Sequence, residues 1–227
     1  MSSSPRIVPL GDSALSIEFH NEISPNTHDA VLALDATLAA SPPAGMTETV
    51  PTYRALLVHF DPLVTDIAQL SAHISPLLQN NQQAKTDVKN WKIPICYSSA
   101  LETDLEEYAK LKTRDPADII TEHSSATYRL YMYGFMPGCA YLGGLPPALA
   151  IPRRQEPRLK VPANSVMVGG AQGLISTVEM PSGWYVLGRT PSPIWAPTMG
   201  EHEYPQPGDT ICFEEIDLAT FHDMERS

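Results

Sequence analysis

Four cationic side chains crowd a short, proline-bounded segment, residues 152–162, in a chain of 227 residues with formal net charge −11. They are Arg153, Arg154, Arg158 and Lys160. Proline fixes φ and removes a backbone donor, so the segment is expected to be a stiff loop and not a helix. Clustered cations in an acidic chain indicate a local anion site. A solvated basic loop is the alternative that charge alone leaves open.

Three further polar residues carry side chains suited to acyl chemistry. His123 could act as a general base or as a donor to an anionic intermediate, and its alternative is a satisfied histidine at a helix end. Gln172 follows two glycines, where an amide and exposed backbone N–H groups could hold an oxyanion. Arg189 could grip a carboxylate with two donors, or hold a turn through a salt bridge.

These residues lead to one site hypothesis. We predict that the arginines of the basic segment converge with Arg189 on an anionic small-molecule substrate, with Gln172 and His123 as catalytic residues lining the same cleft. The substrate-binding set is Arg153, Arg154, Arg158 and Arg189. Long loops without structure of their own tend to order on binding, so residues 149–162 are expected to be mobile in the isolated chain.

Composition excludes several classes of protein. An excess of 26 acidic over 15 basic residues argues against nucleic-acid binding, because phosphate neutralisation needs cations spread over a surface. Three scattered cysteines and seven scattered histidines give no metal-ligand spacing, so no metal is expected. No P-loop, GxSxG or HExxH motif occurs. Without a signal peptide or an apolar run long enough to span a bilayer, a cytoplasmic protein with no membrane contact is expected.

The elements that must position these residues divide into two regions. Strands are predicted over 6–10, 14–19, 48–52, 54–60 and 91–97, with helices from Ser24-Pro25 and from Asp61-Pro62. This order suggests a split βαβ sandwich over residues 1–90. Beyond two short helices, strands over 128–133, 166–169, 174–179, 185–189 and 210–214 predict a barrel or sandwich over residues 91–227.

The longest ordered motifs carry a family resemblance. The chain resembles the family that contains the B subunit of bacterial 5-oxoprolinase, Kip-type histidine-kinase inhibitors and allophanate hydrolase subunit 1, which is also a segment of the urea carboxylase carboxyltransferase domain. The resemblance lies in GFMPGCAYLGGLPP, PRRQEPRLKVPANSV, GGAQ, PSGWYVLGRTP and PGD, with PLGDSALSIEF and PTYRALLVHFDPL nearer the start.

The resemblance implies more than periodicity does. It implies an α+β fold with an N-terminal ferredoxin-like α/β domain followed by a cyclophilin-like β-barrel. It also implies a non-autonomous component of an ATP-dependent, amide-cleaving hydrolase that acts with a homologous second partner, similar to the C subunit of that enzyme. The chain itself would carry no cofactor, and ATP would belong to the complex. The alternatives are a regulatory protein that inhibits a histidine kinase, and a urea carboxylase-like unit.

The chain departs from the family pattern at three places. Residues 173–177 read Gly-Leu-Ile-Ser-Thr where the family has Thr-Gly-Ile-Tyr-Pro, Cys139 replaces an aromatic residue, and Asn164 replaces a glycine. These changes alter the expected ligand wall, so they bear on catalysis more than on the fold.

Overall fold

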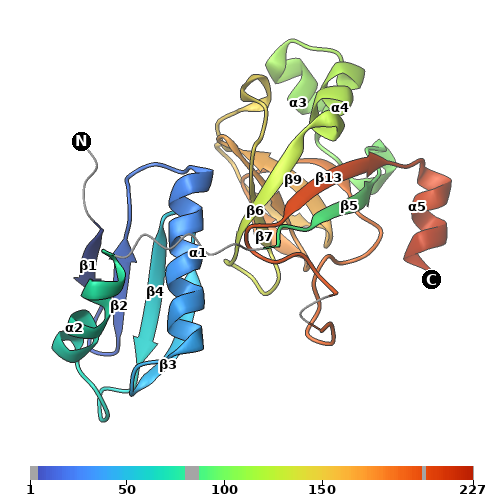
Figure 1. Cartoon of the computed structure of the whole chain (residues 1–227). Helices are drawn as coiled ribbons and strands as arrows, with labels where there is room; N and C mark the ends of the chain where they lie inside the picture. The colour runs from blue at the N-terminus through green and yellow to red at the C-terminus, as the bar shows by residue number, and fades with distance from the viewer. Residues whose placement is uncertain (1–4, 80–86, 201–202, 227) are drawn as a thin grey trace. The chain divides into compact units, whose positions relative to one another are not determined.

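The computed structural model describes residues 5–79, 87–200 and 203–226, and the chain divides into two compact units, Met1–Asp87 and Val88–Ser227 (Figure 1). The sequence-based expectation was a division after residue 90. Each unit has its own apolar core.

Unit 1 is a four-stranded antiparallel sheet with two helices. The order is β1-β2-β4-β3, formed by Arg6–Pro9, Ala14–Glu18, Ala55–Phe60 and Met46–Pro51. The helices are α1 (Pro25–Ala40) and α2 (Ile67–Leu77). Alternating residues of β2 and β4 share one core with both helices, so the helices cover the same sheet face. Its buried members are Leu15, Ile17, Val31, Leu34, Leu38, Leu56, Val58, Phe60, Leu70 and Ile74.

Two expectations for unit 1 are corrected. The strand expected over residues 91–97 does not close this sheet, because β5 (Asn90–Ile95) pairs in unit 2, and β1 lies beside β2. Helix α2 begins at Ile67 because Asp66 caps it by accepting a hydrogen bond from Gln69 N at 2.8 Å. Asp61 instead accepts from Leu63 N at 2.9 Å in a turn, which leaves Leu63 94% exposed.

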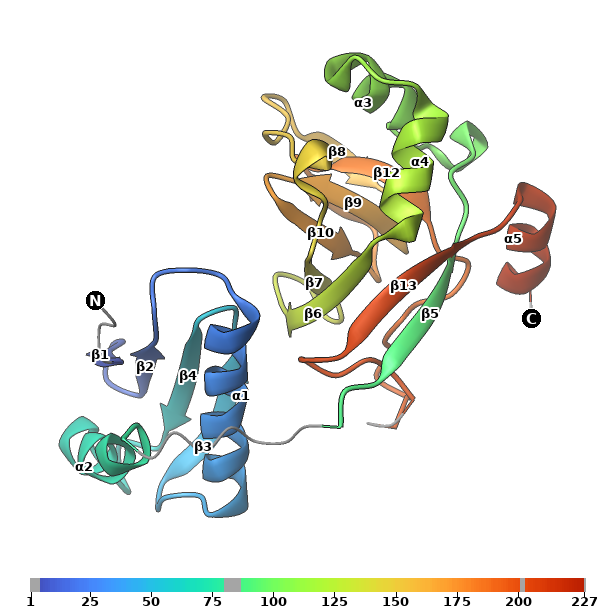
Figure 2. The same cartoon turned by 45° about the horizontal axis from the view of Figure 1, so that its top comes forward.

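Unit 2 is built on a seven-stranded sheet of order β12-β9-β10-β7-β6-β13-β5 (Figure 2). The strands in chain order are β5, then β6 (Thr127–Tyr133), β7 (Ala140–Gly143), β9 (Ser165–Gly169), β10 (Gln172–Ile175), β12 (Tyr185–Arg189) and β13 (Thr210–Glu215). All pairs are antiparallel except β13 with β5. Cys96 and Arg189 exchange two backbone hydrogen bonds of 2.9 Å, which join the region after β5 to β12 and curl the sheet into a half-barrel.

Short elements flank this sheet. They are η1 (Ser99–Leu101), α3 (Leu105–Lys112), α4 (Pro116–Ser125), η2 (Pro147–Leu149), α5 (Leu218–Glu225) and a ribbon of β8 (Arg158–Val161) with β11 (Met180–Ser182). The main core combines the sheet with α3 and α4 through side chains such as Tyr108, Ile119 and Leu130. Strand β9 is buried on both faces, because Val166 and Val168 join this core while Met167 joins a second cluster.

That second cluster lies on the opposite face of the sheet, and we call it the outer cluster. It consists of Cys139, Val161, Met167, Leu174, Met180, Trp184 and Val186, with Met136 and Tyr141 packed against it. Val161 and Met180 come from the β8–β11 ribbon, so the ribbon covers part of this face. The outer cluster underlies the candidate site.

Candidate functional site

Arg153 lies on the indole ring of Trp184. Its guanidinium carbon is 5.2 Å from the ring centroid, within the range of a cation–π contact. Trp184 in turn lies over the backbone of Gly169, where an added Cβ would be 2.6 Å from the ring. Only glycine at this position allows the ring to lie so close to the strand. The sheet therefore presents the guanidinium on a fixed aromatic support.

Tyr141 borders the same indole, and Gln172 lies on the strand beside the glycine under that ring. The Tyr141 ring stands edge-on to Trp184 with centroids 6.0 Å apart. Burial raises the pKa of the Tyr141 hydroxyl, and the charge of Arg153 opposes that shift, which places the guanidinium within electrostatic reach of the hydroxyl. Gln172 pairs across the ladder with Gly169, directly beneath Trp184. We call Arg153, Trp184, Tyr141 and Gln172 the Arg153 surface.

The other cations of the basic segment have carboxylate partners. Arg154 forms ion pairs with Asp104 at 2.9 Å and with Glu107 at 2.6 Å, and Arg158 meets Asp104 at 3.1 Å. Lys160 lies 2.9 Å from Glu179. For Arg153, by contrast, the described part of the chain offers no carboxylate within ion-pairing distance.

Asp104 organises this network. The carboxylate precedes α3 and accepts a hydrogen bond from Val186 N at 2.8 Å, besides meeting Arg154 and Arg158. Its own backbone N–H donates to Val186 O at 2.6 Å. The side chain is only 10% exposed, so the ion pairs are partly shielded from water. Asp104 therefore ties α3, β12 and the basic segment together.

Residues 149–154, which lead into the basic segment, are anchored by hydrogen bonds, which favours a fixed element over the expected mobile loop. Tyr108 Oη donates to Leu149 O, and Lys112 Nζ donates to Ala150 O at 2.9 Å. Ile151 and Gly170 exchange backbone hydrogen bonds of 3.0 and 2.7 Å, and Arg154 N donates to Gly183 O at 2.7 Å. The segment ends in β8, so it has structure of its own. These anchors hold Arg153 in place.

His123 lies inside the core and not in a surface site. It is 1% exposed, stacked on Phe213 with ring centroids 5.0 Å apart, and its Nδ1 lies 2.8 Å from Tyr97 Oη. Burial lowers its pKa to about 3, because the charged imidazolium would lose its hydration. The burial speaks against the expected general-base role and agrees with the alternative of a satisfied histidine at the end of α4.

The expected convergence of four arginines on one anion is not what the structure shows. Arg189 donates from Nε to Ala163 O at 3.1 Å, and its guanidinium lies 5.6 Å from the Phe221 ring centroid. Arg154 and Arg158 neutralise Asp104 instead of facing a common empty position. The turn after β9 also differs, since Gly170 N–H donates to Ile151 O and is not free for an oxyanion. Of the predicted residues, Arg153 contacts Trp184, and Gln172 pairs across the ladder with the glycine under that ring.

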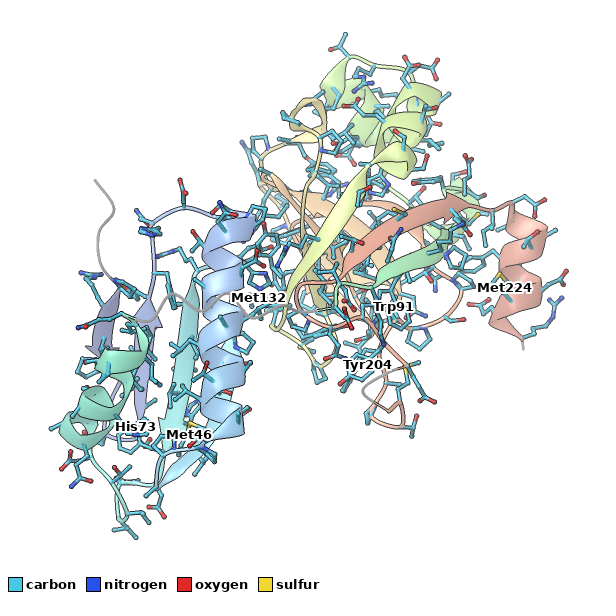
Figure 3. All side chains as sticks on the ribbon, in the orientation of Figure 1. Met46, His73, Trp91, Met132, Tyr204 and Met224 are labelled. Carbon is cyan, nitrogen blue, oxygen red and sulfur yellow. The ribbon has the colours of Figure 1, made fainter. Side chains whose placement is uncertain are left out.

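One buried carboxylate was missed as a structural centre. Asp209, in the PGD motif, is 5% exposed and accepts hydrogen bonds from Lys89 N, Gln206 N and Trp91 Nε1, at 2.9, 2.9 and 2.8 Å. Figure 3 labels Trp91 and Tyr204 in this part of unit 2. The Pro-Gly-Asp sequence by itself indicates a turn. The partners of Asp209 at the start of β5, Lys89 and Trp91, are far away in the sequence and are identified only by the fold.

Two of the three departures from the family pattern, Asn164 and Cys139, have local explanations. Asn164 has φ of 60°, a left-handed conformation that asparagine tolerates better than most residues other than glycine. Cys139 is fully buried and packs in the outer cluster, with its Sγ 3.9 Å from Met180 Sδ. Within residues 5–79, 87–200 and 203–226, no group of His, Cys, Asp or Glu side chains could hold a metal ion, and no helix is long and apolar enough to cross a bilayer.

Comparison with known proteins finds one family. The family model for the carboxyltransferase domain, subdomains C and D, matches residues 5–204. The chain is 30% identical over 234 residues to the B subunit of 5-oxoprolinase from Bacillus subtilis, covering 96% of this chain and 95% of that protein. It is 37% identical over 163 residues to the B subunit of 5-oxoprolinase from Haemophilus influenzae, covering 71% and 73% of the two chains.

Solved structures share the fold. The structure of TTHA0988 matches with a TM-score of 0.78 and 30% identity, over 90% of this chain and 40% of that chain. This chain therefore spans less than half the length of that polypeptide. Kluyveromyces lactis urea carboxylase matches with a TM-score of 0.81 over 96% of this chain and 22% of its own, at 17% identity, a likeness of fold alone.

Proposed function

The chain belongs to the carboxyltransferase-domain family, subdomains C and D, and on that premise we propose that it is one component of a 5-oxoprolinase-like, amide-cleaving hydrolase. The observation that carries the proposal is the match to the B subunit of 5-oxoprolinase along almost the whole of both chains. The name of that relative speaks of a subunit, so the proposal includes a homologous partner resembling the C subunit of such an enzyme. In the same proposal the finer fold names are ferredoxin-like for unit 1 and cyclophilin-like for unit 2.

The Arg153 surface fits a carboxylate-bearing substrate. A guanidinium offers a planar fork of donors that matches a carboxylate, and Arg153 has no carboxylate of the described chain to occupy that fork. The cation–π contact with Trp184 restricts the side chain in advance, so less side-chain entropy is lost on binding. A 5-oxoproline carries one carboxylate beside its cyclic amide. In this proposal Arg153 binds the carboxylate, and Gln172, which pairs across the ladder with the glycine under Trp184, contacts the ring amide.

In this proposal the groups needed for cleavage are divided between this chain and its partner. Hydrolysis adds water across the amide C–N bond and leaves a carboxylate and an amine, which requires a base and activation of the carbonyl. His123, buried and with a depressed pKa, is a poor base for that step. The proposal therefore assigns the base and the use of ATP to the complex with the partner. This chain would contribute substrate recognition.

Recovery of the partner tests the proposal. The chain would be affinity-tagged at its own locus, purified from its native cells, and its companions identified by mass spectrometry against an untagged control. We expect a stoichiometric homologous partner, and ATP-dependent cleavage of 5-oxoproline by the recovered complex. Recovery of the chain as a solitary, active enzyme would contradict the partner, and a complex that never cleaves 5-oxoproline would contradict the reaction.

A further inference from the structure

One aromatic residue has a backbone conformation that neither a helix end nor its residue type explains. In the described ranges, the non-glycine residues with positive φ are Glu102, Thr113, Phe135 and Asn164. Glu102 and Thr113 are the residues that end η1 and α3, where the left-handed conformation is common. Asn164 also has an ordinary explanation, because asparagine tolerates this conformation. Phe135, with φ of 70°, is a bulky residue outside any helix end, which makes it a genuine outlier.

The loop around Phe135, residues 134–139 between β6 and β7, is held firmly. Gly134 N donates to Cys139 O at 3.0 Å, and Cys139 N donates to Met136 O at 3.1 Å. Thr177 Oγ1 donates to Pro137 O, and Met136 packs on the outer cluster. Gly138 lies so close to Trp195 that an added Cβ would be 2.3 Å from the ring. The surrounding contacts therefore impose the conformation of Phe135.

The Phe135 side chain contributes little to the packing of this chain, although its backbone is strained. Phe135 is 68% exposed, although large aromatic rings stabilise a fold mainly by being buried. The strained backbone costs free energy, and the exposure of an apolar ring to water costs more. Strained residues that persist tend to mark functional positions, and rigid exposed aromatic residues are typical anchors of protein interfaces.

We propose that Phe135 is an aromatic anchor that enters an apolar pocket on the homologous partner. This inference rests on the proposed function, which supplies the partner. A ring held in advance by its loop loses little conformational entropy on binding, and its removal from water favours association.

The comparisons favour this occupant. The fold of this chain accounts for 40% of the TTHA0988 polypeptide and 22% of urea carboxylase, where the same unit is continuous with further sequence. The relative that this chain matches over 95% of its length is named a subunit, so in the proposed function the neighbour is a separate protein. The anchor is thus expected to face another protein and not a small molecule.

Substitutions at Phe135 separate an anchor from a structural residue. Phe135→Ala removes the ring and keeps the backbone strain, whereas Phe135→Gly removes the ring and relieves the strain. Phe135→Trp keeps an aromatic ring. Leu111→Ala, in α3, is the matched control, because Leu111 is also an exposed apolar residue, at 56%. Affinity for the purified homologous partner from the same organism and the thermal unfolding midpoint would be measured for each full-length variant.

We expect Phe135→Ala and Phe135→Gly to weaken binding by about 30-fold, the threshold of an interface hot spot, with Phe135→Trp and Leu111→Ala within a few-fold of wild type. Phe135→Gly should unfold at a temperature no lower than Phe135→Ala, because glycine accepts positive φ. Wild-type affinity in both Phe135→Ala and Phe135→Gly would overturn the anchor while leaving the proposed function intact. Failure of the wild-type chain itself to bind would instead overturn the proposed function.

Discussion

Arg153 is the residue on which substrate recognition depends in our proposal. Its charge is supported by Trp184 and lacks a carboxylate partner in the described chain, whereas Lys160 is paired with Glu179. Arg153→Ala should therefore raise KM for 5-oxoproline in the reconstituted complex by about 10-fold or more, the loss of one charge-assisted contact. Arg153→Lys should weaken binding as well, because a point charge lacks the fork. Steady-state kinetics measure both.

Lys160→Ala is the matched control for this prediction. It removes one positive charge from the same segment but is expected to leave KM within about 2-fold of wild type, since an exposed ion pair contributes little. Equal KM values for wild type, Arg153→Ala and Lys160→Ala would show that the Arg153 surface does not bind the substrate.

The burial of His123 should make the folding stability of the chain depend on pH. The unfolded chain protonates this histidine near pH 6.5, whereas the folded chain does so only near pH 3. Stability is therefore fully present above pH 6.5 and falls as pH drops below it, because the unfolded state then binds the extra proton. Between pH 7 and pH 5 this one group should lower the free energy of unfolding by about 2 kcal/mol.

Urea denaturation of wild type and His123→Gln at several pH values isolates this effect. The variant should start less stable at pH 7, because it loses the stacking on Phe213, but its stability should fall less on acidification. Parallel pH profiles for the two proteins would mean that His123 titrates in the folded state as it does in the unfolded state.

At the residue scale, sequence indicates side-chain chemistry better than it indicates partners. The cluster of cations was visible from spacing, but the acidic residues that neutralise Arg154 and Arg158 lie about fifty positions away, before and within α3. Likewise, nothing near His123 in the sequence shows that Tyr97 and Phe213 enclose it. Long-range pairing decided which predicted site residues remained available for a ligand.

At the scale of elements, Asp104 is the central residue, because it joins the start of α3 to β12 and to the basic segment. Asp104→Asn keeps the shape of the side chain but removes the charge that balances Arg154 and Arg158. We expect a loss of about 2–4 kcal/mol in the free energy of unfolding, since a partly buried ion pair loses one partner. Faster hydrogen exchange should appear at Arg154, whose N–H is bonded to Gly183 O.

Glu106→Gln is a suitable control for Asp104→Asn. Glu106 lies in the first turn of α3, two residues after Asp104, but is exposed and has no part in the network of the described residues. It should change stability by only a few tenths of a kcal/mol. If Asp104→Asn were as stable as Glu106→Gln, with unchanged exchange in the basic segment, the anchoring role of Asp104 would be wrong.

Element types follow local patterns more reliably than element boundaries do. Ser24 with Pro25 marks the start of α1 correctly, because the cap and the fixed φ act locally. The same pattern at Asp61-Pro62 is misleading, since Asp61 forms a turn and Asp66 caps α2. Strand β8, within the proline-bounded segment, was not predicted, because its pairing with β11 depends on the tertiary fold.

At the scale of the whole molecule, unit 2 should fold by itself. Its sheet, its main core and the outer cluster are formed by residues of Val88–Ser227, and Asp209 ties Lys89 and Trp91 into the same unit. A fragment of residues 88–227 should unfold cooperatively in urea, as followed by tryptophan fluorescence, because Trp91, Trp184 and Trp195 all lie in it. A fragment that aggregates or unfolds without a cooperative transition would contradict this expectation.

Asp209→Asn tests what holds this unit together. In the fragment, the change weakens charge-assisted hydrogen bonds from Lys89 N and Trp91 Nε1, so the free energy of unfolding should fall by about 1.5–3 kcal/mol. Denaturation midpoints measure the change, and wild-type stability in the variant would show that the carboxylate is dispensable.

The family assignment rests on similarity that extends through most of both units, whereas the activity remains a proposal about an assembly. Measuring 5-oxoproline cleavage with purified components tests that proposal most directly. This chain, its homologous partner and their mixture would each be incubated with 5-oxoproline and ATP, and release of glutamate would be followed. Our account predicts that neither protein acts alone and that only the mixture cleaves the amide when ATP is present. Cleavage by this chain without the partner, or a stable mixture that leaves 5-oxoproline untouched, would contradict it.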